Sequence, residues 1–237
     1  MAKCYPIFVF ACLLLATNLS AAIKTWIGPD EGSWNNAANW SPAGVPSSVD
    51  DVEISGFWGA ILIETNNPTV HSLQVINGAD VTFRAEQSNR QITVNCIACG
   101  SGIESGSTAT FTGTPGYSNR SCSLKFFSSP AFSVDGTLIF TGSSSSILYA
   151  TNATVTVNGS LIFDGDGNAS LVCTGGTTTV NGEIIYTGGG STTATASNLF
   201  ISNNATYEIA KNGGMVPNAN WATSSTLPRT WYGTLRF

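Results

Sequence analysis

The stretch that decides the fold lies in the second half of the chain and occurs three times: FSVDGTLIFTG at 132–142, VTVNGSLIFDG at 155–165 and TTVNGEIIYTG at 178–188. The central glycines of the copies are Gly136, Gly159 and Gly182, so the spacing is 23 in both intervals (159 − 136 and 182 − 159). Every other matched position keeps this interval. A fixed period of this length indicates a fold assembled from one repeated structural unit.

Each copy has the composition of two short strands joined by a turn. Val, Ile, Phe, Tyr and Thr suit a pleated surface. The Asp-Gly and Asn-Gly pairs predict turns in which the backbone takes a left-handed conformation. The repeat is too short for a strand–helix–strand unit. The sequence therefore predicts an all-β chain, a right-handed parallel β-helix (β-solenoid) with one repeat per coil, or rung. A β-sandwich is the alternative, although a sandwich has no reason to repeat its sequence.

Equivalent residues of successive rungs should stack about 4.8 Å apart as ladders. Three inner ladders are expected: Val134, Val157 and Val180; Leu138, Leu161 and Ile184; and Phe140, Phe163 and Tyr186. Because alternate strand residues point to opposite faces, Ile139, Ile162 and Ile185 should form an apolar ladder outside the coil. Either a loop or the C-terminal segment covers this ladder, or it is a docking stripe for another chain.

Looser copies of the repeat extend the pattern in both directions, at 73–83, 103–111 and 199–209, which leaves room for roughly six rungs. The predicted organisation is a signal peptide at 1–22, an N-terminal cap with the first strands at 23–69, solenoid repeats at 70–210, and a C-terminal segment or cap at 211–237.

Composition narrows the functional classes. The chain has 237 residues, of which 10% are charged, and a formal net charge of −5. Nucleic-acid binding relies on Lys and Arg facing phosphates, so nucleic acid is not expected as a partner. A single histidine, His71, excludes a histidine-cluster metal site, and no Ser–His–Asp context is visible around it in the sequence.

The N-terminus has the layout of a signal peptide. A positive start at Lys3 precedes an apolar run from Tyr5 to Ala16, and small residues before Ile23 suit cleavage after Ala22. The alternative is an uncleaved anchor, which would need a longer apolar run. The protein is therefore expected to be secreted or at the cell surface, with no transmembrane segment in the mature chain.

Tryptophans cluster at the start of the mature chain. Trp26, Trp34 and Trp40 lie close together among few aliphatic residues, just before the expected first strand Val52–Ile54. An open terminal rung would expose core and unpaired strand edges, so we interpret this segment as a cap. Sugar stacking by the tryptophans is the functional alternative.

Four cysteines remain in the mature chain: Cys96, Cys99, Cys122 and Cys173. The pair Cys96 and Cys99 has no second C-x-x-C or histidine pair to complete a zinc site, so disulfide bonding or burial is expected. Cys99 and Cys122 share the spacing of 23 (122 − 99), which could place them on neighbouring rungs as a disulfide. Two free buried thiols are the other interpretation.

The best candidate carboxylate pair is Asp164 and Asp166 in Asp164-Gly165-Asp166-Gly167-Asn168. A second acidic group, Asp50, Asp51 and Glu53, is interpreted as part of the cap. The stretch 164–168 resembles half of a calcium loop, so Asp164 and Asp166 are candidate Ca²⁺ ligands. It lacks the distal Glu of such a loop, so a solvated turn is the simpler interpretation. Parallel β-helices also host polysaccharide-degrading enzymes, and these two residues would then be the catalytic candidates. No catalytic residue and no cofactor other than this candidate calcium ion is assigned.

The beginning of the mature chain also carries a family resemblance. Its layout, W-x-G followed by G-x-W-N-x-A-x-N-W-S-x-x-G-V-P and D-D-V-x-I over 26–54, resembles bacterial exported surface proteins with β-helical passenger regions, autotransporter-like or Bacteroidetes-type adhesin-like. The segment 205–221 resembles a stretch of the Bacteroidetes-type proteins. The resemblance implies export and a β-helix, in a short or truncated member.

These observations lead to one functional expectation and two alternatives. The expectation is a non-enzymatic surface stalk or adhesin-like binding module whose partner is a surface glycan or a protein. The first alternative is a polysaccharide lyase or hydrolase. Ice binding by a flat Thr face around Thr177, Thr178 and Thr179 is a minor third option, because regular T-x-T ladders are not evident in the sequence.

Overall fold

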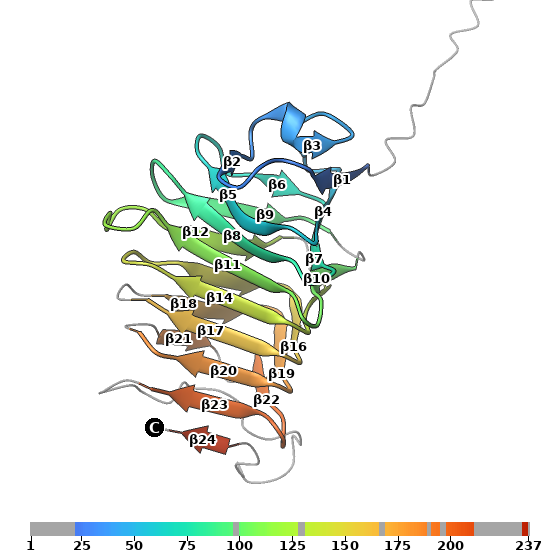
Figure 1. Cartoon of the computed structure of the whole chain (residues 1–237). Coiled ribbons are helices and arrows are strands. Elements are labelled where there is room, and N and C mark those ends of the chain that lie inside the picture. Colours follow the sequence, from blue (N-terminus) through green and yellow to red (C-terminus); the bar gives the residue numbers. More distant parts are fainter. Residues whose placement is uncertain are drawn as a thin grey trace, which may run out of the picture.

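The structure is a computed structural model that describes residues 22–96, 100–127, 131–165, 169–188, 191–194, 198–210 and 234–236. It is a β-solenoid in which three sheets of stacked strands run along a common axis (Figure 1). Apart from the antiparallel pair of strands β1 and β3 at the N-terminal end, the paired strands of the described residues run parallel. The predicted fold class is confirmed.

From β4 to β21, each of six successive rungs contributes one strand to each sheet. Sheet A contains β1(Ile23–Trp26), β3(Trp40–Ser41), β4(Asp51–Ser55), β7(Ser72–Ile76), β10(Ser101–Ile103), β13(Ala131–Val134), β16(Thr154–Val157), β19(Thr177–Val180) and β22(Leu199–Ile201). Sheet B contains β2(Gly32–Ser33), β5(Trp58–Ile63), β8(Asp80–Ala85), β11(Thr108–Gly113), β14(Thr137–Thr141), β17(Ser160–Asp164), β20(Glu183–Tyr186), β23(Thr206–Ile209) and β24(Thr234–Arg236). Sheet C contains β6(Thr69–Val70), β9(Arg90–Val94), β12(Cys122–Phe126), β15(Ile147–Thr151), β18(Ser170–Thr174) and β21(Ser191–Ala194).

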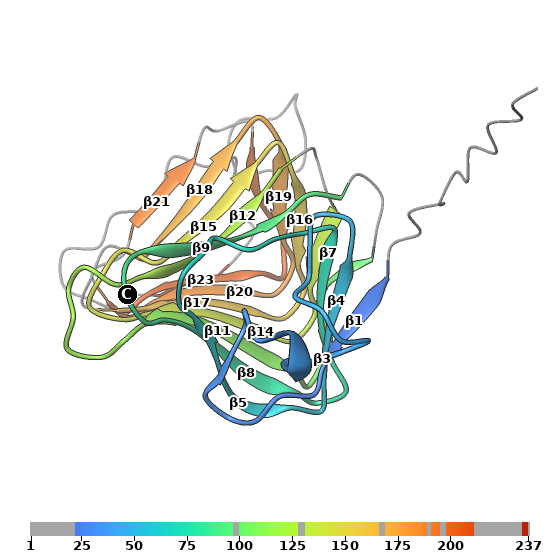
Figure 2. The same ribbon diagram turned by 90° about the horizontal axis from the view of Figure 1, so that it is seen from above.

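The coil is right-handed. Seen from the N-terminal end, the chain passes clockwise from β7 to β8 to β9 while it recedes from the viewer (Figure 2). Figure 1 agrees, since the strands of sheet B run across the front, those of sheet C lie behind, and sheet A closes one side. This handedness matches the strong preference of parallel crossover connections.

The predicted inner ladders form in register. Val134 pairs with Val157 and Val157 with Val180, while Leu138, Leu161 and Ile184 align in the same way on sheet B. All of these side chains are fully buried, because the pleat alternates inward and outward residues along each strand. The core is therefore one continuous column of apolar side chains.

An aromatic ladder runs through most of this core. It comprises Phe83, Phe111, Phe140, Phe163, Tyr186 and Tyr207. Ring centroids of Phe140 and Phe163 are 5.5 Å apart at 16°, and those of Phe163 and Tyr186 are 4.8 Å apart at 12°. Rings at these separations contribute about 0.5–1.5 kcal/mol per pair beyond the burial of their area. The ladder was predicted for three rungs and extends over six.

The glycines of the repeated Asp-Gly and Asn-Gly pairs have a different role from the one predicted. Asn77 and Gly78 do take the left-handed conformation, with φ of 57° and 69°. Gly136, Gly159 and Gly182 do not. A Cβ on Gly159 would lie 2.1 Å from the carbonyl oxygen of Gly136 in the rung before, so glycine is needed there for close stacking. The prediction of left-handed turns is wrong for the three repeats.

The cap is built around the three N-terminal tryptophans. Trp26, Trp34 and Trp40 are at most 4% exposed and pack edge to face, with centroids 5.0 Å apart for Trp26–Trp40 and 4.8 Å for Trp34–Trp40. The 3-10 helix η1(Ala37–Asn39) and the antiparallel pair β1–β3 cover the first rung (Figure 1). Sugar stacking by these buried rings is therefore ruled out, and the cap interpretation fits their geometry. The strand expected to be first is β4, although the short strands β1, β2 and β3 precede it.

The predicted Cys99–Cys122 disulfide is wrong. Cys122 is a free, fully buried thiol, as is Cys173, whereas Cys96 takes part in a disulfide. The register explains the error: Cys122 pairs with Arg90, a spacing of 32 (122 − 90), because a loop at 114–121 lengthens this rung. Burial raises the pKa of both thiols, that of Cys173 to about 11, so neither is a reactive thiolate at neutral pH.

Candidate functional site

The site with the most functional side chains lies at the edge of the outer face of sheet B. Strand register brings Arg84 beside Thr112 and Thr141 beside Asp164. Phe111 pairs with Phe140, so the residues that follow them, Thr112 and Thr141, lie on neighbouring rungs. In the same way Phe163 pairs with Tyr186, which places Thr187 beside Asp164. These five residues form one outward column, with one member on each of five successive rungs.

An open hollow of about 560 Å³ runs along four of these five rungs, at the ends of β11, β14, β17 and β20. We call it the corner groove. Its polar side chains are Thr112, Thr141, Ser143, Asp164 and Thr187. Its remaining lining consists of Gly113, Pro115, Gly116, Gly142, Gly165 and Gly188. It is larger than two hollows of about 340 and 120 Å³ on sheet A.

The glycines leave the floor of the corner groove without side chains. A Cβ on Gly165 would lie 2.6 Å from the carbonyl oxygen of Gly142, and one on Gly188 would lie 1.9 Å from that of Gly165. The backbones of neighbouring rungs therefore approach too closely for any other residue. The result is a row of four glycines without side chains, Gly113, Gly142, Gly165 and Gly188, which we call the glycine strip. Gly142 and Gly188 are half-buried, and Gly113 and Gly165 are buried.

The wall of the groove is the loop at 114–121, which the longer rung supplies. Thr114 Oγ1 donates a hydrogen bond to the carbonyl oxygen of Ala85 at 2.8 Å, which ties the start of the loop to the rung before. Ser143 Oγ donates to the carbonyl oxygen of Tyr117 at 3.2 Å, which ties the loop to the rung after. The guanidinium carbon of Arg120 lies 3.6 Å from the centre of the Tyr117 ring, a cation–π contact. The wall is thus anchored on both sides.

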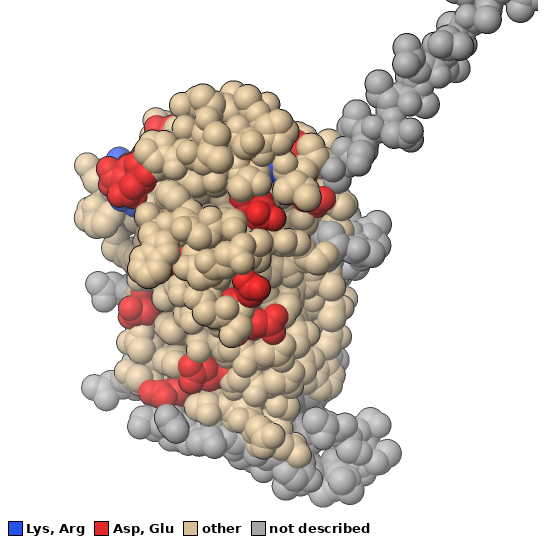
Figure 3. Space-filling view, turned by 45° about the vertical axis from the view of Figure 1, so that its right-hand side comes forward, with Lys and Arg blue, Asp and Glu red and all other residues tan. Residues whose placement is uncertain are grey.

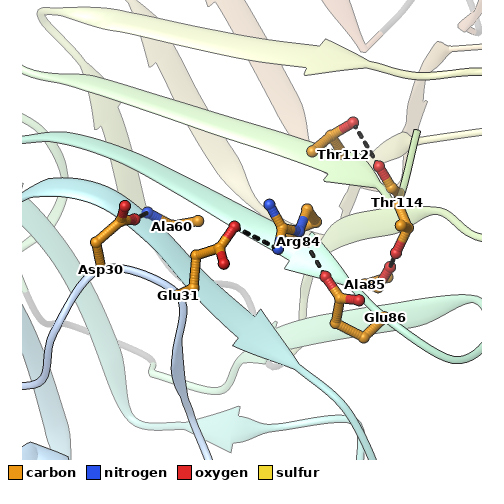
Figure 4. Close-up of polar contacts among 9 residues, drawn as sticks. Asp30, Glu31, Ala60, Arg84, Ala85, Glu86, Thr112 and Thr114 are labelled. Carbon is orange, nitrogen blue, oxygen red and sulfur yellow. Dashed lines mark hydrogen bonds and ion pairs between the residues drawn. The ribbon is translucent and has the colours of Figure 1, made fainter.

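The upper end of the column carries a compact ion cluster (Figure 4). Arg84 Nε donates to Glu86 Oε1 at 2.5 Å, and Arg84 Nη2 donates to Glu31 Oε1 at 3.0 Å. Partial burial opposes the charge of Arg84, but the hydrogen bonds and attraction of Glu86 and Glu31 outweigh it, so its pKa is raised. Because the guanidinium is already paired with two carboxylates, this end of the column is not a ready anion-binding site.

Hydrogen bonding inside the groove leaves mainly acceptors facing solvent. Thr187 Oγ1 donates to Asp164 Oδ1 at 2.6 Å, and Thr112 Oγ1 donates to the carbonyl oxygen of Gly113 at 3.1 Å. Ser143 also donates internally, to the wall loop. A hydroxyl has one proton and two lone pairs, so each of these groups retains acceptor capacity. The groove is therefore suited to a ligand that presents hydrogen-bond donors.

The predicted pair Asp164 and Asp166 is only half described. Asp164 lies exposed in the corner groove, while Asp166 falls outside the described residues. Within the described ranges, no group of three His, Cys, Asp or Glu side chains could hold a metal ion. Calcium binding at Asp164 and Asp166 stays a prediction.

The outward isoleucine ladder is present. Ile139, Ile162 and Ile185 pair in register on the outer face of sheet B, and each is half-buried. Thr110 precedes the ladder and Glu208 follows it, so the apolar stretch spans three rungs. The C-terminal segment 211–233, one of the two expected covers, lies outside the described residues.

The structure brings together one constellation that the sequence did not predict. His71 Nδ1 lies 2.8 Å from Asp51 Oδ1, and Ser72 Oγ donates to the same oxygen at 2.5 Å. An acyl-transfer triad needs the serine hydroxyl to bond to the histidine, with the aspartate on the other ring nitrogen. Here Ser72 bonds to the aspartate, so the arrangement lacks the geometry of a nucleophilic triad.

The groove and one exposed aromatic side chain were missed from the sequence. The signal for the groove was the last dipeptide of each copy, Thr141-Gly142, Asp164-Gly165 and Thr187-Gly188. Its period places a polar side chain and a glycine at the same corner of three successive rungs. The aromatic is Trp58, 73% exposed at the start of β5 and paired with Asp80; Tyr117 and Phe127 are exposed to a lesser extent. No repeat signal marked it.

Comparisons with models of known protein families, with curated proteins and with solved structures find no match to this chain. Among the residues that the structure describes, none belongs to a helix long and apolar enough to span a bilayer. The function has therefore to be argued from the fold and the groove.

Proposed function

We propose that this chain is an exported, non-enzymatic β-solenoid that acts at the cell surface or outside the cell as an adhesin-like binding module or structural stalk, with glycans as its ligand class. The observation that carries the proposal is the outer surface of the stacked core, where hydroxyl side chains recur from rung to rung. On sheet B these are Thr82, Thr108, Thr110, Thr112, Thr137, Thr141 and Ser160.

Hydroxyl groups on a rigid sheet suit an uncharged, hydroxyl-rich partner. Each can donate and accept hydrogen bonds, and the parallel ladders hold them at fixed spacing. Charged side chains are sparse on the face shown in Figure 3, where scattered acidic residues are visible and most of the surface is neutral. A neutral glycan would meet little electrostatic repulsion on such a surface.

Export is supported by the sequence from Met1 to Ala22. A positive start, a short apolar run and small residues before Ile23 match a cleavable signal. N-terminal sequencing of protein recovered outside the producing cells should begin at Ile23. Recovery of the uncleaved chain from inside the cells would contradict export.

The test of binding is an array of neutral, acidic and amino glycans, with released sugar assayed in the same wells. We expect saturable binding without released sugar. Glycoside hydrolysis uses two carboxylates about 5–10 Å apart, and the described lining of the corner groove supplies one, Asp164. Sugar release that Asp164→Ala abolishes would replace the proposal with a polysaccharide-degrading enzyme. Absence of binding to every glycan would overturn the binding function.

A further inference from the structure

The corner groove runs along the solenoid axis and repeats its chemistry once per rung. Thr112, Thr141, Asp164 and Thr187 stand on four successive rungs, so the polar edge is about 14 Å long at about 4.8 Å per rung. The glycine strip lies beside this edge for its full length, because each of the four residues is followed by a glycine. A linear ligand laid parallel to the axis would match this edge along its whole length.

The internal hydrogen bonds of the groove define which groups such a ligand offers. Thr112, Ser143 and Thr187 direct their protons to protein oxygens, so they face the ligand as acceptors. Asp164 adds carboxylate oxygens to the same edge. The ligand therefore presents donors at intervals along its length, as the hydroxyl groups of a polysaccharide do.

The charges around the groove favour an uncharged ligand. No Lys or Arg is among the described residues that line it, so acidic sugars would gain no counter-charge there and would approach Asp164. Of the nearby cations, Arg84 bonds to Glu86 and Glu31. The guanidinium of Arg120 stacks on Tyr117, and its Nε has no hydrogen-bond partner among the described residues. Acidic polysaccharides, phosphates and sulfates are accordingly disfavoured.

We infer that the corner groove is the binding site for a neutral polysaccharide strand, laid parallel to the solenoid axis between the glycine strip and the wall loop. This inference rests on the proposed glycan-binding function and assigns its site and ligand class. The hydroxyls of successive sugar units donate to Asp164 and to the threonine column, and the absence of side chains along the glycine strip lets the strand approach closely.

The test measures affinity of the purified chain for dextran, mannan and laminarin, with alginate and chitosan as acidic and cationic counterparts. The double variant Thr141→Val, Asp164→Ala removes an acceptor hydroxyl and the carboxylate from the middle of the groove. Losing a hydrogen bond to a charged group should weaken binding at least about tenfold. Ser143→Leu, which fills the groove from an exposed position, should also weaken binding and gives an independent readout.

Two variants serve as controls, and circular dichroism checks that all variants fold. Thr179→Val makes the same chemical change as Thr141→Val on the outer face of sheet A, and we expect affinity within roughly twofold of the unaltered chain. Trp58→Ala removes the exposed tryptophan on another column of sheet B, and we expect affinity to be retained there too.

The possible results distinguish an error in the assigned site, the corner groove, from an error in the proposed glycan-binding function. Loss of binding to a neutral polysaccharide in the groove variants, with both controls unaffected, supports the inference. Binding that survives the groove variants, or is lost only in Trp58→Ala, overturns the site while glycan binding stands. Preference for alginate or chitosan overturns the neutral ligand class. Failure to bind any of the polysaccharides or array glycans overturns the inference and the proposed function together.

Discussion

The upper and lower rungs of the solenoid share a core but differ in their turns. On sheet B, Thr108 stacks on Asp80, a spacing of 28 (108 − 80), and Thr137 stacks on Thr108, a spacing of 29 (137 − 108). Below Thr137 the spacing is 23 at every step to Thr206 (160 − 137, 183 − 160 and 206 − 183). The inward side chains stay in register throughout, so the extra residues of the upper rungs are accommodated in loops.

This difference explains where the candidate site lies. The lower rungs, with their repeated Thr-Gly and Asp-Gly pairs, supply the floor and polar edge of the corner groove. The longer upper rung supplies the wall loop at 114–121. A solenoid with only identical rungs would have a flat corner here, whereas one inserted loop beside a regular array creates a groove.

The largest expected effect tests whether the core is continuous across both regions. Phe163→Ala in the lower rungs and Phe111→Ala in the upper rungs each remove a fully buried ring from the same ladder. Each should lower the free energy of unfolding by about 3–5 kcal/mol, through lost burial and the cavity left behind. Chemical unfolding followed by circular dichroism measures both. A much smaller loss for Phe111→Ala would mean that the upper rungs pack loosely.

The second prediction separates two uses of glycine. Gly159→Ala places a Cβ against the backbone of the rung before and should cost about 1–3 kcal/mol, because backbone has to move. Gly78→Ala meets nothing within 4 Å but forces a left-handed conformation on alanine, which should cost about 1 kcal/mol. Thermal unfolding of the two variants compares them. Equal costs would contradict the close-stacking role of the repeat glycines.

A smaller effect is expected on the outside of the lower rungs. Ile162→Ala changes the residue next to Phe163 but on the opposite face, where the side chain is half-buried between Ile139 and Ile185. Its loss should cost under about 1 kcal/mol, the range of a single contact across a sheet. Sedimentation of Ile162→Lys beside the unaltered chain tests the docking stripe. Self-association that disappears in this variant would show that the ladder joins copies of the chain.

The smallest effect concerns a polar ladder in the regular rungs. Asn158 Nδ2 donates to Asp135 Oδ1 at 2.7 Å, and Asn181 Nδ2 donates to Asn158 Oδ1 at 2.9 Å. The hydrogen bonds from Asn158 and from Ser133 lower the pKa of Asp135. Asn158→Ala should therefore raise this pKa toward its ordinary value, whereas Asn181→Ala should leave it nearly unchanged. Carboxyl titration by NMR distinguishes the two variants.

The sign of the pH dependence follows from that direction. Because the carboxyl of Asp135 loses its proton more readily in the folded chain, its hydrogen bonds stabilise the fold above about pH 4, and the contribution disappears as the pH falls through the lowered pKa. The stability gap between the unaltered chain and Asn158→Ala should shrink on acidification. A gap that widens below about pH 4 would contradict this assignment.

The sequence by itself determined the solenoid, its inner ladders and its outward isoleucines. A strict period of 23 combined with the two-residue alternation of strands leaves little freedom about which side chains stack and which face inward. The burial of Phe140, Phe163 and Tyr186 follows directly from that pattern.

Only the tertiary structure decided what happens where the period breaks. The longer rung at 114–121 shifts Cys122 into register with Arg90, which excludes the disulfide inferred from spacing. The loop at 114–121 also lies beside a corner formed by later rungs, as far along the sequence as Gly188. This loop turns the glycine-lined corner into a groove. Such contacts depend on the path of a loop in space, for which a local pattern of residues carries no signal.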